Sequence, residues 1–220
     1  VKMLLKLEKI NVNQYSLKKG FTPLIAAIKN KSLEAAELLI LYPKTDINQQ
    51  DYDRNTALCY AVQNDLENIV DLLIKNEKFD HEKNRINHIF TFSHFPIATK
   101  LASIKMLDVN NIVYIYENTK HKRKIFYSTK LIESAKSNDI KMIDLIVHHP
   151  SFDKNKSKIK NAIIQSIMNK KFVAFKYLIE VLNNDVNICD PNGLSLLNYS
   201  CRYLNDEVLD YIINNEKFDS

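Results

Sequence analysis

The sequence predicts an all-α protein, a solenoid of stacked antiparallel helix pairs whose links form β-turns or hairpin fingers. One observation is the pentapeptide NEKFD, which stands at residues 76–80 and again at 215–219. Another is that similar blocks close on an Asp at intervals of 35, 34, 28, 45, 32 and 34 residues, counted from Asn11. The two irregular intervals sum to 73 residues, about two periods, so about six repeats are expected, including partial ends.

Helix signals are clearest in the first full repeat. Thr22 is placed to cap a helix, because its hydroxyl can accept a hydrogen bond from a free N–H, and Pro23 suits the first helical position. Apolar residues at i, i+3 and i+4 spacing predict two helices. The expected buried stripes are Leu24, Ala27 and Ile28 on the first helix, and Ala35, Leu38 and Leu39 on the second.

An Asn recurs in each turn between paired helices. A tight turn of this kind often needs one residue at positive φ, which Gly adopts most easily and Asn next. The chain has only two Gly, so we expect Asn to take these positions. The residues concerned are Asn30, Asn64, Asn138, Asn169 and Asn205.

The middle of the chain departs from the regular period. The interval 80–108 is short and contains Pro96, so its helices should be abbreviated. The following link is about 11 residues longer than the others and is rich in Ile, Val, Tyr and Phe, which favour strands. We expect an extended β-hairpin finger over residues 112–128; the alternative is a third helix over residues 111–118.

The NEKFD blocks are interpreted as structural joints between repeats. Each block would close a second helix, with Phe79 and Phe218 packed against the neighbouring repeat. Asp80 and Asp219 would accept hydrogen bonds from the backbone of the following turn, as Asp often does.

These residues resemble the ankyrin repeat. The run from Thr22 to Ala27 resembles its T-P-L-H-x-A signature, with Ile25 in place of His. The Asp-Ile/Val-Asn triplets at residues 46–48, 108–110 and 185–187 resemble the link between repeats in this family. The resemblance covers nearly the whole chain as degenerate, Asn- and Lys-rich repeats, and a TPR array is disfavoured because its Trp/Tyr-Gly pattern is missing.

The expected domain organisation is one ankyrin-repeat array over residues 1–220. It comprises a partial repeat 1–21, then repeats 22–55, 56–84, an irregular 85–128 with the long finger 112–128, 129–161, 162–194 and 195–220. The chain starts at Val1 with what resembles a second helix and stops where a repeat closes. We therefore expect it to be a fragment of a longer chain.

Composition favours a binding module over an enzyme. The sequence lacks the motifs of a nucleophile elbow, a Walker A loop, a dinucleotide-binding loop and a zinc protease. The cysteines Cys59, Cys189 and Cys201 lack metal or disulfide spacing, which predicts reduced thiols in a cytoplasmic or nuclear protein. No catalytic residue, metal or cofactor is expected. The net charge of +5 alone does not indicate a nucleic-acid partner.

The expected function is a non-catalytic protein–protein interaction scaffold. The resemblance implies that fingers and first helices bind the partner, through Lys29, Asn30, Tyr52, Asp53, Asn55, Gln63 and Asn64. Basic finger residues are Lys120, Lys122, Arg123, Lys124, Lys154 and Lys156, which fit an acidic protein segment. Solvated lysines, or binding of nucleic acid or anionic lipid, are the alternatives for this group. The alternative function is a regulatory or targeting segment of a larger enzyme or channel.

Overall fold

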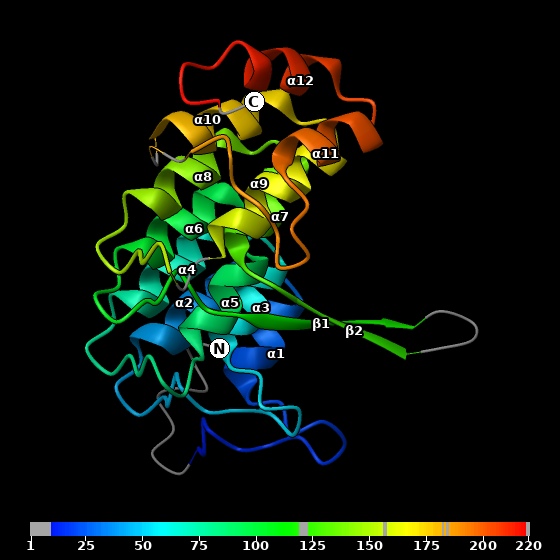
Figure 1. The fold of residues 1–220 in the computed structure, drawn as a ribbon. Coiled ribbons are helices and arrows are strands. Elements are labelled where there is room, and N and C mark those ends of the chain that lie inside the picture. The colour runs from blue at the N-terminus through cyan, green and yellow to red at the C-terminus, as the bar shows by residue number, and fades with distance from the viewer. Residues whose placement is uncertain (1–9, 119–122, 156–157, 182, 184, 219–220) are drawn as a thin grey trace. The chain divides into compact units, whose positions relative to one another are not determined.

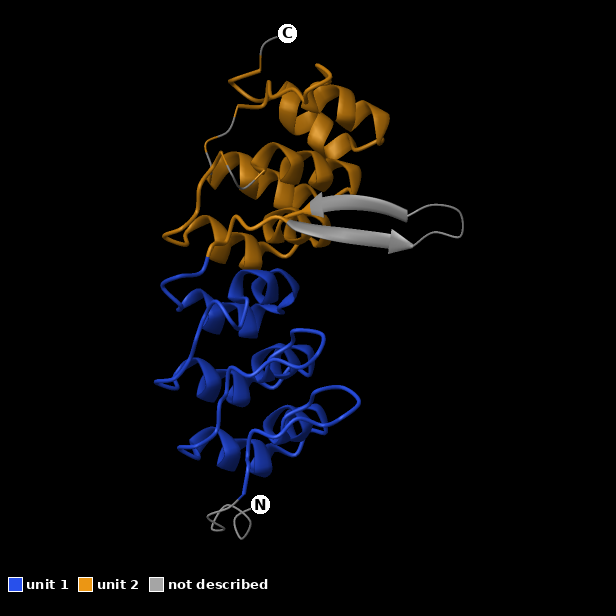
Figure 2. Ribbon diagram, turned by 90° about the horizontal axis from the view of Figure 1, so that it is seen from below, with its two compact units in different colours: residues 1–107 blue, residues 108–220 orange. Residues whose placement is uncertain are grey.

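The computed structural model describes residues 10–118, 123–155, 158–181, 183 and 185–218. They form two compact units, residues 1–107 and 108–220, coloured separately in Figure 2. Each unit is built from short antiparallel helix pairs, and the core of each lies between successive pairs. The fold is therefore helical and repetitive, as the sequence predicts.

Unit 1 holds three helix pairs within its described residues. They are α1 (Pro23–Lys29) with α2 (Leu33–Leu41), α3 (Ala57–Gln63) with α4 (Glu67–Ile74), and α5 (Ile86–Phe92) with α6 (Phe95–Ala102). First helices contact first helices, as α1 does α3, and α2 contacts α4, which contacts α6 (Figure 1). First helices and second helices therefore form two adjacent rows in unit 1.

The predicted start of α1 is confirmed. The Thr22 hydroxyl accepts a hydrogen bond from the Ile25 N–H at 3.2 Å, and Pro23 occupies the first turn. Thr129 repeats this cap, accepting from the Ile132 N–H at 3.3 Å. Pro96 does not interrupt a helix but lies in the first turn of α6, where its missing N–H costs nothing.

The buried face of α1 agrees with the sequence, whereas that of α2 is shifted by one position. Leu24, Ala27 and Ile28 are buried together with Ile25. On α2 the buried residues are Ala36, Leu39 and Ile40. The prediction is right for Leu39 and wrong for Ala35 and Leu38, which are half-buried. Apolar residues surround this helix on nearly every side, so periodicity could not select its core face. Packing against α1 and α4 selects it instead.

The prediction that Asn residues take the positive-φ turn positions is wrong at four of five sites. Of these five residues, only Asn138 has a positive φ, at 62°. Elsewhere a neighbouring residue adopts the left-handed conformation, at a cost of roughly 1–2 kcal/mol each. These residues are Lys31, Asp65, Lys170 and Leu204. Asn30, Asn64 and Asn169 cap the preceding helix and Asn205 caps the following one, with φ between −87° and −108°.

Unit 2 begins with a hairpin and continues as helix pairs. Its elements are β1 (Val113–Asn118), β2 (Arg123–Ser128), α7 (Lys130–Ser137), α8 (Ile140–Val147), α9 (Ile159–Met168), α10 (Phe172–Val181), α11 (Leu196–Arg202) and α12 (Asp206–Ile213). Fully buried side chains such as Ile143, Ile163 and Phe175 fill the space between the pairs. Among the described helices none exceeds 10 residues, too short for a membrane span.

The long finger is a hairpin, as predicted. β1 and β2 pair antiparallel in a register that places Val113 opposite Ser128 and Tyr116 opposite Ile125 (Figure 1). The alternative of a helix over residues 111–118 is therefore wrong. β-branched and aromatic residues on both strands favour this extended structure.

Candidate interaction surface

The Asp-x-Asn triplets connect successive repeats through side-chain amides. In the first triplet, residues 46–48, the Asp46 carboxylate accepts from the Asn48 N–H at 3.0 Å, which orients Asn48. The Asn48 amide then donates to the Lys78 carbonyl at 2.6 Å and accepts from the Asp80 N–H at 3.0 Å. Asn48 is 7% exposed, so these bonds are shielded from water. This bridge joins two repeats by a pair of hydrogen bonds.

The same bridge recurs in both units. Asn13 bonds the Lys44 carbonyl and the Asp46 N–H, both at 2.8 Å. In unit 2, Asn110 bonds the Ser151 carbonyl at 2.6 Å and the Asp153 N–H at 2.9 Å. Asn187 donates to the Lys217 carbonyl. These hydrogen bonds therefore fix the position of each repeat relative to the next one. The fingers extend from repeats that are held in this way.

The first NEKFD pentapeptide supplies the backbone groups to which Asn48 of the preceding repeat bonds. Asn76 accepts from the Lys78 N–H at 3.0 Å, and this turn presents the Lys78 carbonyl to Asn48. Asp80 accepts from the backbone of Glu82 and Lys83, both at 3.0 Å, as predicted; Asp219 lies outside the described residues. Phe79 is only half-buried, and so is Phe218, so neither ring is a core anchor.

A buried carboxylate shapes the finger that leads into α3. Asp51 is 5% exposed and accepts from the N–H groups of Asp53 at 2.9 Å and Asn55 at 2.8 Å. It also accepts from the Tyr60 hydroxyl at 2.7 Å. Burial, and then this bond to the Asp51 carboxylate, raise the pKa of Tyr60 to about 12. The finger is thereby fixed to the helix that follows it.

The finger that leads into α11 repeats this arrangement. Asp190 accepts from the N–H groups of Asn192 at 2.9 Å and Leu194 at 2.8 Å, and from the Tyr199 hydroxyl at 2.9 Å. The hydrogen bond from Leu194 is the main cause that lowers the pKa of Asp190. In both fingers the Tyr follows the Asp by nine residues, a spacing that could have been found in the sequence.

Two tyrosines from neighbouring fingers lie together on the surface of unit 1. The rings of Tyr15 and Tyr52 have centroids 6.2 Å apart and are 44% and 63% exposed. Gly20, at φ +69°, lies beneath Tyr52; a Cβ there would stand 2.6 Å from the ring carbon Cδ1. The Tyr52 N–H donates to the Lys19 carbonyl at 3.3 Å, which joins the two fingers.

A cation lies over two further rings at the base of these fingers. Lys29 Nζ is 4.4 Å from the Phe21 ring centroid and 5.1 Å from that of Tyr60. Phe21 and Tyr60 meet edge to face, with centroids 5.8 Å apart. Such contacts hold an otherwise flexible lysine in place. We call Tyr15, Phe21, Lys29, Tyr52 and Tyr60 together the finger patch.

The structure brings some of the predicted site residues together and separates others. Lys29 and Tyr52 belong to the finger patch, and Asp53 is exposed on the same finger as Tyr52. Asn30 and Gln63 are exposed at helix ends, whereas Asn55 is half-buried. Asn64 is half-buried too and donates to the Ile28 carbonyl at 3.4 Å, a role within the fold.

The basic finger residues lie in unit 2. Arg123 and Lys124 are on β2, and Lys154 is exposed. Lys120, Lys122 and Lys156 lie outside the described residues. The aromatic members Tyr15, Phe21 and Tyr60 were missed by sequence reasoning, because only folding brings two fingers and a helix together. Among the described residues, no group of His, Cys, Asp and Glu is arranged to hold a metal ion.

Paired short helices, fingers and bridging asparagines define the class: an α-helical repeat protein. The family model for ankyrin repeats, in three copies, matches residues 1–87. Residues 1–87 are therefore similar to ankyrin repeats, and this match covers less than half of the chain. The Asn110 and Asn187 bridges extend the same connection beyond the matched residues.

Two solved structures illustrate the comparison. One is the crystal structure of EF0377, an ankyrin repeat protein, with 20% identity, a TM-score of 0.42, and coverage of 98% of this chain and 91% of that chain. The other is a chain from the complex of Bd0816, a predatory endopeptidase from Bdellovibrio bacteriovorus, with the immunity protein Bd3460. It has 21% identity, a TM-score of 0.40, and coverage of 96% and 88%. No curated protein sequence matches the chain.

Proposed function

We propose that this chain is a non-catalytic module that binds a protein partner through the finger patch of unit 1. Ankyrin repeats are in general protein–protein interaction modules, and their fold is typically non-catalytic. The proposal also takes residues 1–220 as one array of repeats, as the sequence predicts. An acidic segment is the partner chemistry that the basic residues of the chain favour.

The finger patch is the observation that carries this proposal. It exposes two tyrosine rings and holds a lysine over two more rings. Tyr is enriched among the residues that dominate binding energy at protein interfaces. The Asp51 hydrogen bonds and the Lys19 carbonyl bond fix the finger before any partner arrives. A surface ordered in advance loses less conformational entropy on binding.

The test begins with a peptide library displayed on phage and selected on the 220-residue chain. Selected peptides are then measured against Tyr52→Ala and Gly20→Ala. We expect both to weaken binding about tenfold or more, the first by removing the ring and the second by displacing it with a new Cβ.

Gly193→Ala is the matched control, because Gly193 also has a positive φ, +80°, but a Cβ there meets nothing within 4 Å. Binding should be unchanged in this variant. Peptides that bind all three variants and the parent chain equally would show that the finger patch is not the binding surface.

A further inference from the structure

A second surface of unit 1 lies along the groove between α2 and α4, on helices that carry none of the finger patch. Leu33, Glu37 and Leu41 are spaced by four on α2 and so lie along one stripe. Asn68 and Leu72 form the facing stripe on α4. We call these five residues, with the side chains at either end, the α2–α4 groove. Its length from Leu33 to Leu41 is about 12 Å.

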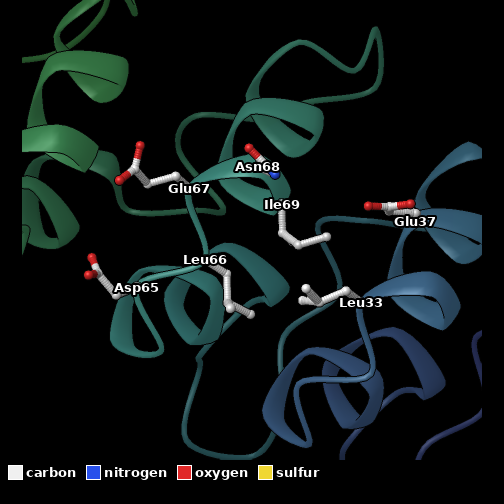
Figure 3. Close-up of a pocket in the computed structure, with 7 residues that line it drawn as sticks. All are labelled: Leu33, Glu37, Asp65, Leu66, Glu67, Asn68 and Ile69. Atoms are coloured by element: carbon white, nitrogen blue, oxygen red, sulfur yellow. The ribbon is translucent and has the colours of Figure 1, made fainter.

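The groove is hollowed at both ends. A hollow of about 420 Å³ lies at the first turns of the two helices, where Leu33, Leu66 and Ile69 form an apolar floor (Figure 3). A second hollow, of about 360 Å³, lies at the last turns and includes Leu41 and Leu72. Leu33 is 44% exposed and Leu41 is 69% exposed, so apolar surface faces water at both ends of the groove.

The first-turn end is acidic. Glu37, Asp65 and Glu67 line its hollow, and Figure 3 shows Glu37 on one side of the apolar floor and the other two on the opposite side. Within the described part of the chain, Glu37 and Asp65 have no ion pair or side-chain hydrogen bond. Glu67 is 3.9 Å from Lys100, which pairs more closely with Asp71 at 2.6 Å.

Helix N-termini bear a partial positive charge, which favours carboxylates nearby even when no ligand is bound. Two helix ends contribute roughly half a charge each, so they offset about one of the three carboxylates. A net negative charge therefore remains over an apolar floor. That combination fits a lysine or arginine, whose aliphatic stem packs on apolar surface while its charged end meets carboxylates.

The last-turn end lacks this net negative charge. Lys75, Glu77 and Lys78 line its hollow beside Leu41 and Leu72, and Lys78 donates to the Pro43 and Thr45 carbonyls. The one net positive charge is about offset by the partial negative charge of the two helix C-termini. An occupant that spans the groove must therefore be basic over the first-turn end and apolar over the last-turn end. A helix running antiparallel to α2 has this polarity, because basic residues favour helix C-termini.

We propose that the α2–α4 groove binds an amphipathic helix of a protein partner, antiparallel to α2. Leucine-like side chains of that helix lie over Leu41 and Leu72, and arginine or lysine in its last turn lies beside Glu37 and Asp65. Docking an apolar helix face into a groove is a common mode of peptide recognition. The small size of the groove fits a transient contact. This surface is separate from the finger patch and does not depend on it.

The experiment uses the 220-residue chain and a fluorescein-labelled, alanine-based helical peptide. The peptide carries two leucines on one face and two arginines in its last turn; a companion carries glutamates in place of the arginines. Fluorescence anisotropy should show binding of the arginine peptide and at least tenfold weaker binding of the companion. Glu37→Gln with Asp65→Asn should weaken the arginine peptide about tenfold. Asn tolerates the positive φ of 57° at position 65, so the turn is kept.

The matched control, Glu82→Gln with Asp206→Asn, makes the same charge change at exposed positions outside the groove. It should leave binding within twofold of the parent chain. Leu41→Asn should weaken binding at least threefold, whereas Leu204→Asn, at a site 75% exposed outside the groove, should not.

Three results would overturn the proposal: no binding of the arginine peptide, equal losses in the two acid pairs, or equal binding of both peptides. Self-association of the chain that Glu37→Gln with Asp65→Asn abolishes would assign the groove to a second copy instead. Loss of finger-patch binding alone leaves this proposal unaffected.

Discussion

Asn48→Ala tests whether the asparagine bridges hold the repeats together. Asn48 is 7% exposed and makes three inter-residue contacts through its side chain: with the Lys78 carbonyl, the Asp80 N–H and the Asn84 amide, which donates to it at 2.8 Å. A hydrogen bond contributes about 0.5–1.5 kcal/mol net, and a buried partner left unpaired costs more. We therefore expect a loss of about 3 kcal/mol in the free energy of unfolding.

The assay is urea unfolding followed by far-UV circular dichroism, combined with hydrogen exchange at the Asp80 N–H. Exchange is needed because repeats can open separately, which would spread the transition. Asn13→Ala, which removes two bonds at a half-buried site, should lose about half as much. Asn68→Ala, on the exposed side of α4, should be neutral or slightly stabilising.

A loss below about 1 kcal/mol for Asn48→Ala, with unchanged exchange at Asp80, would refute the bridge as a source of stability. It would mean that water replaces the amide without cost. The packed apolar residues alone would then set the register between repeats.

Three further variants probe other parts of unit 1. Thr22→Ala should cost about 1 kcal/mol in urea unfolding, because it removes the cap of α1; no change would show that the hydroxyl bond is dispensable. Phe79→Ala should cost only about 2 kcal/mol because the ring is half-buried, against about 3–5 kcal/mol for Phe90→Ala at 1% exposure; equal losses would contradict this ranking. Tyr60 has a pKa raised from 10.0 to about 12, so its contribution to stability is complete below pH 10 and is lost as pH rises towards 12. Tyr60→Phe should remove one late tyrosinate transition from the absorbance at 295 nm and flatten the fall in stability over that range; an unchanged titration would refute the assignment.

The finger patch shows where sequence reasoning fell short. Lys29 and Tyr52 could be predicted as surface residues because each stands at a position that the ankyrin resemblance marks. Tyr60 could not, because its ring contacts Phe21 and Lys29 across two repeats, and its hydroxyl reaches back to Asp51. These contacts depend on the spacing between repeats, which a linear pattern does not specify.

The core face of α2 and the turn geometry show the same limit. An apolar run such as that of α2 fits more than one stripe, so the neighbouring helices decide that Ala36, Leu39 and Ile40 are buried. In the turns between paired helices, the point where the first helix ends decides which residue takes the left-handed backbone conformation. After α1 that residue is Lys31 and not Asn30. The preference of Asn for the left-handed conformation does not decide the turn. A left-handed residue such as Lys31 costs less free energy than the loss of packing between the paired helices.

The sequence by itself determined the helical repeat, the period, the cap at Thr22, and the hairpin over β1 and β2. Each of these follows from short-range chemistry: apolar periodicity, hydroxyl capping and strand preference. Tertiary structure alone decided what the Asp-x-Asn triplets do, because the partners of Asn48 lie 30 and 32 residues away. It also decided the finger patch and the α2–α4 groove, since both are assembled from residues that only the stacking of repeats brings together.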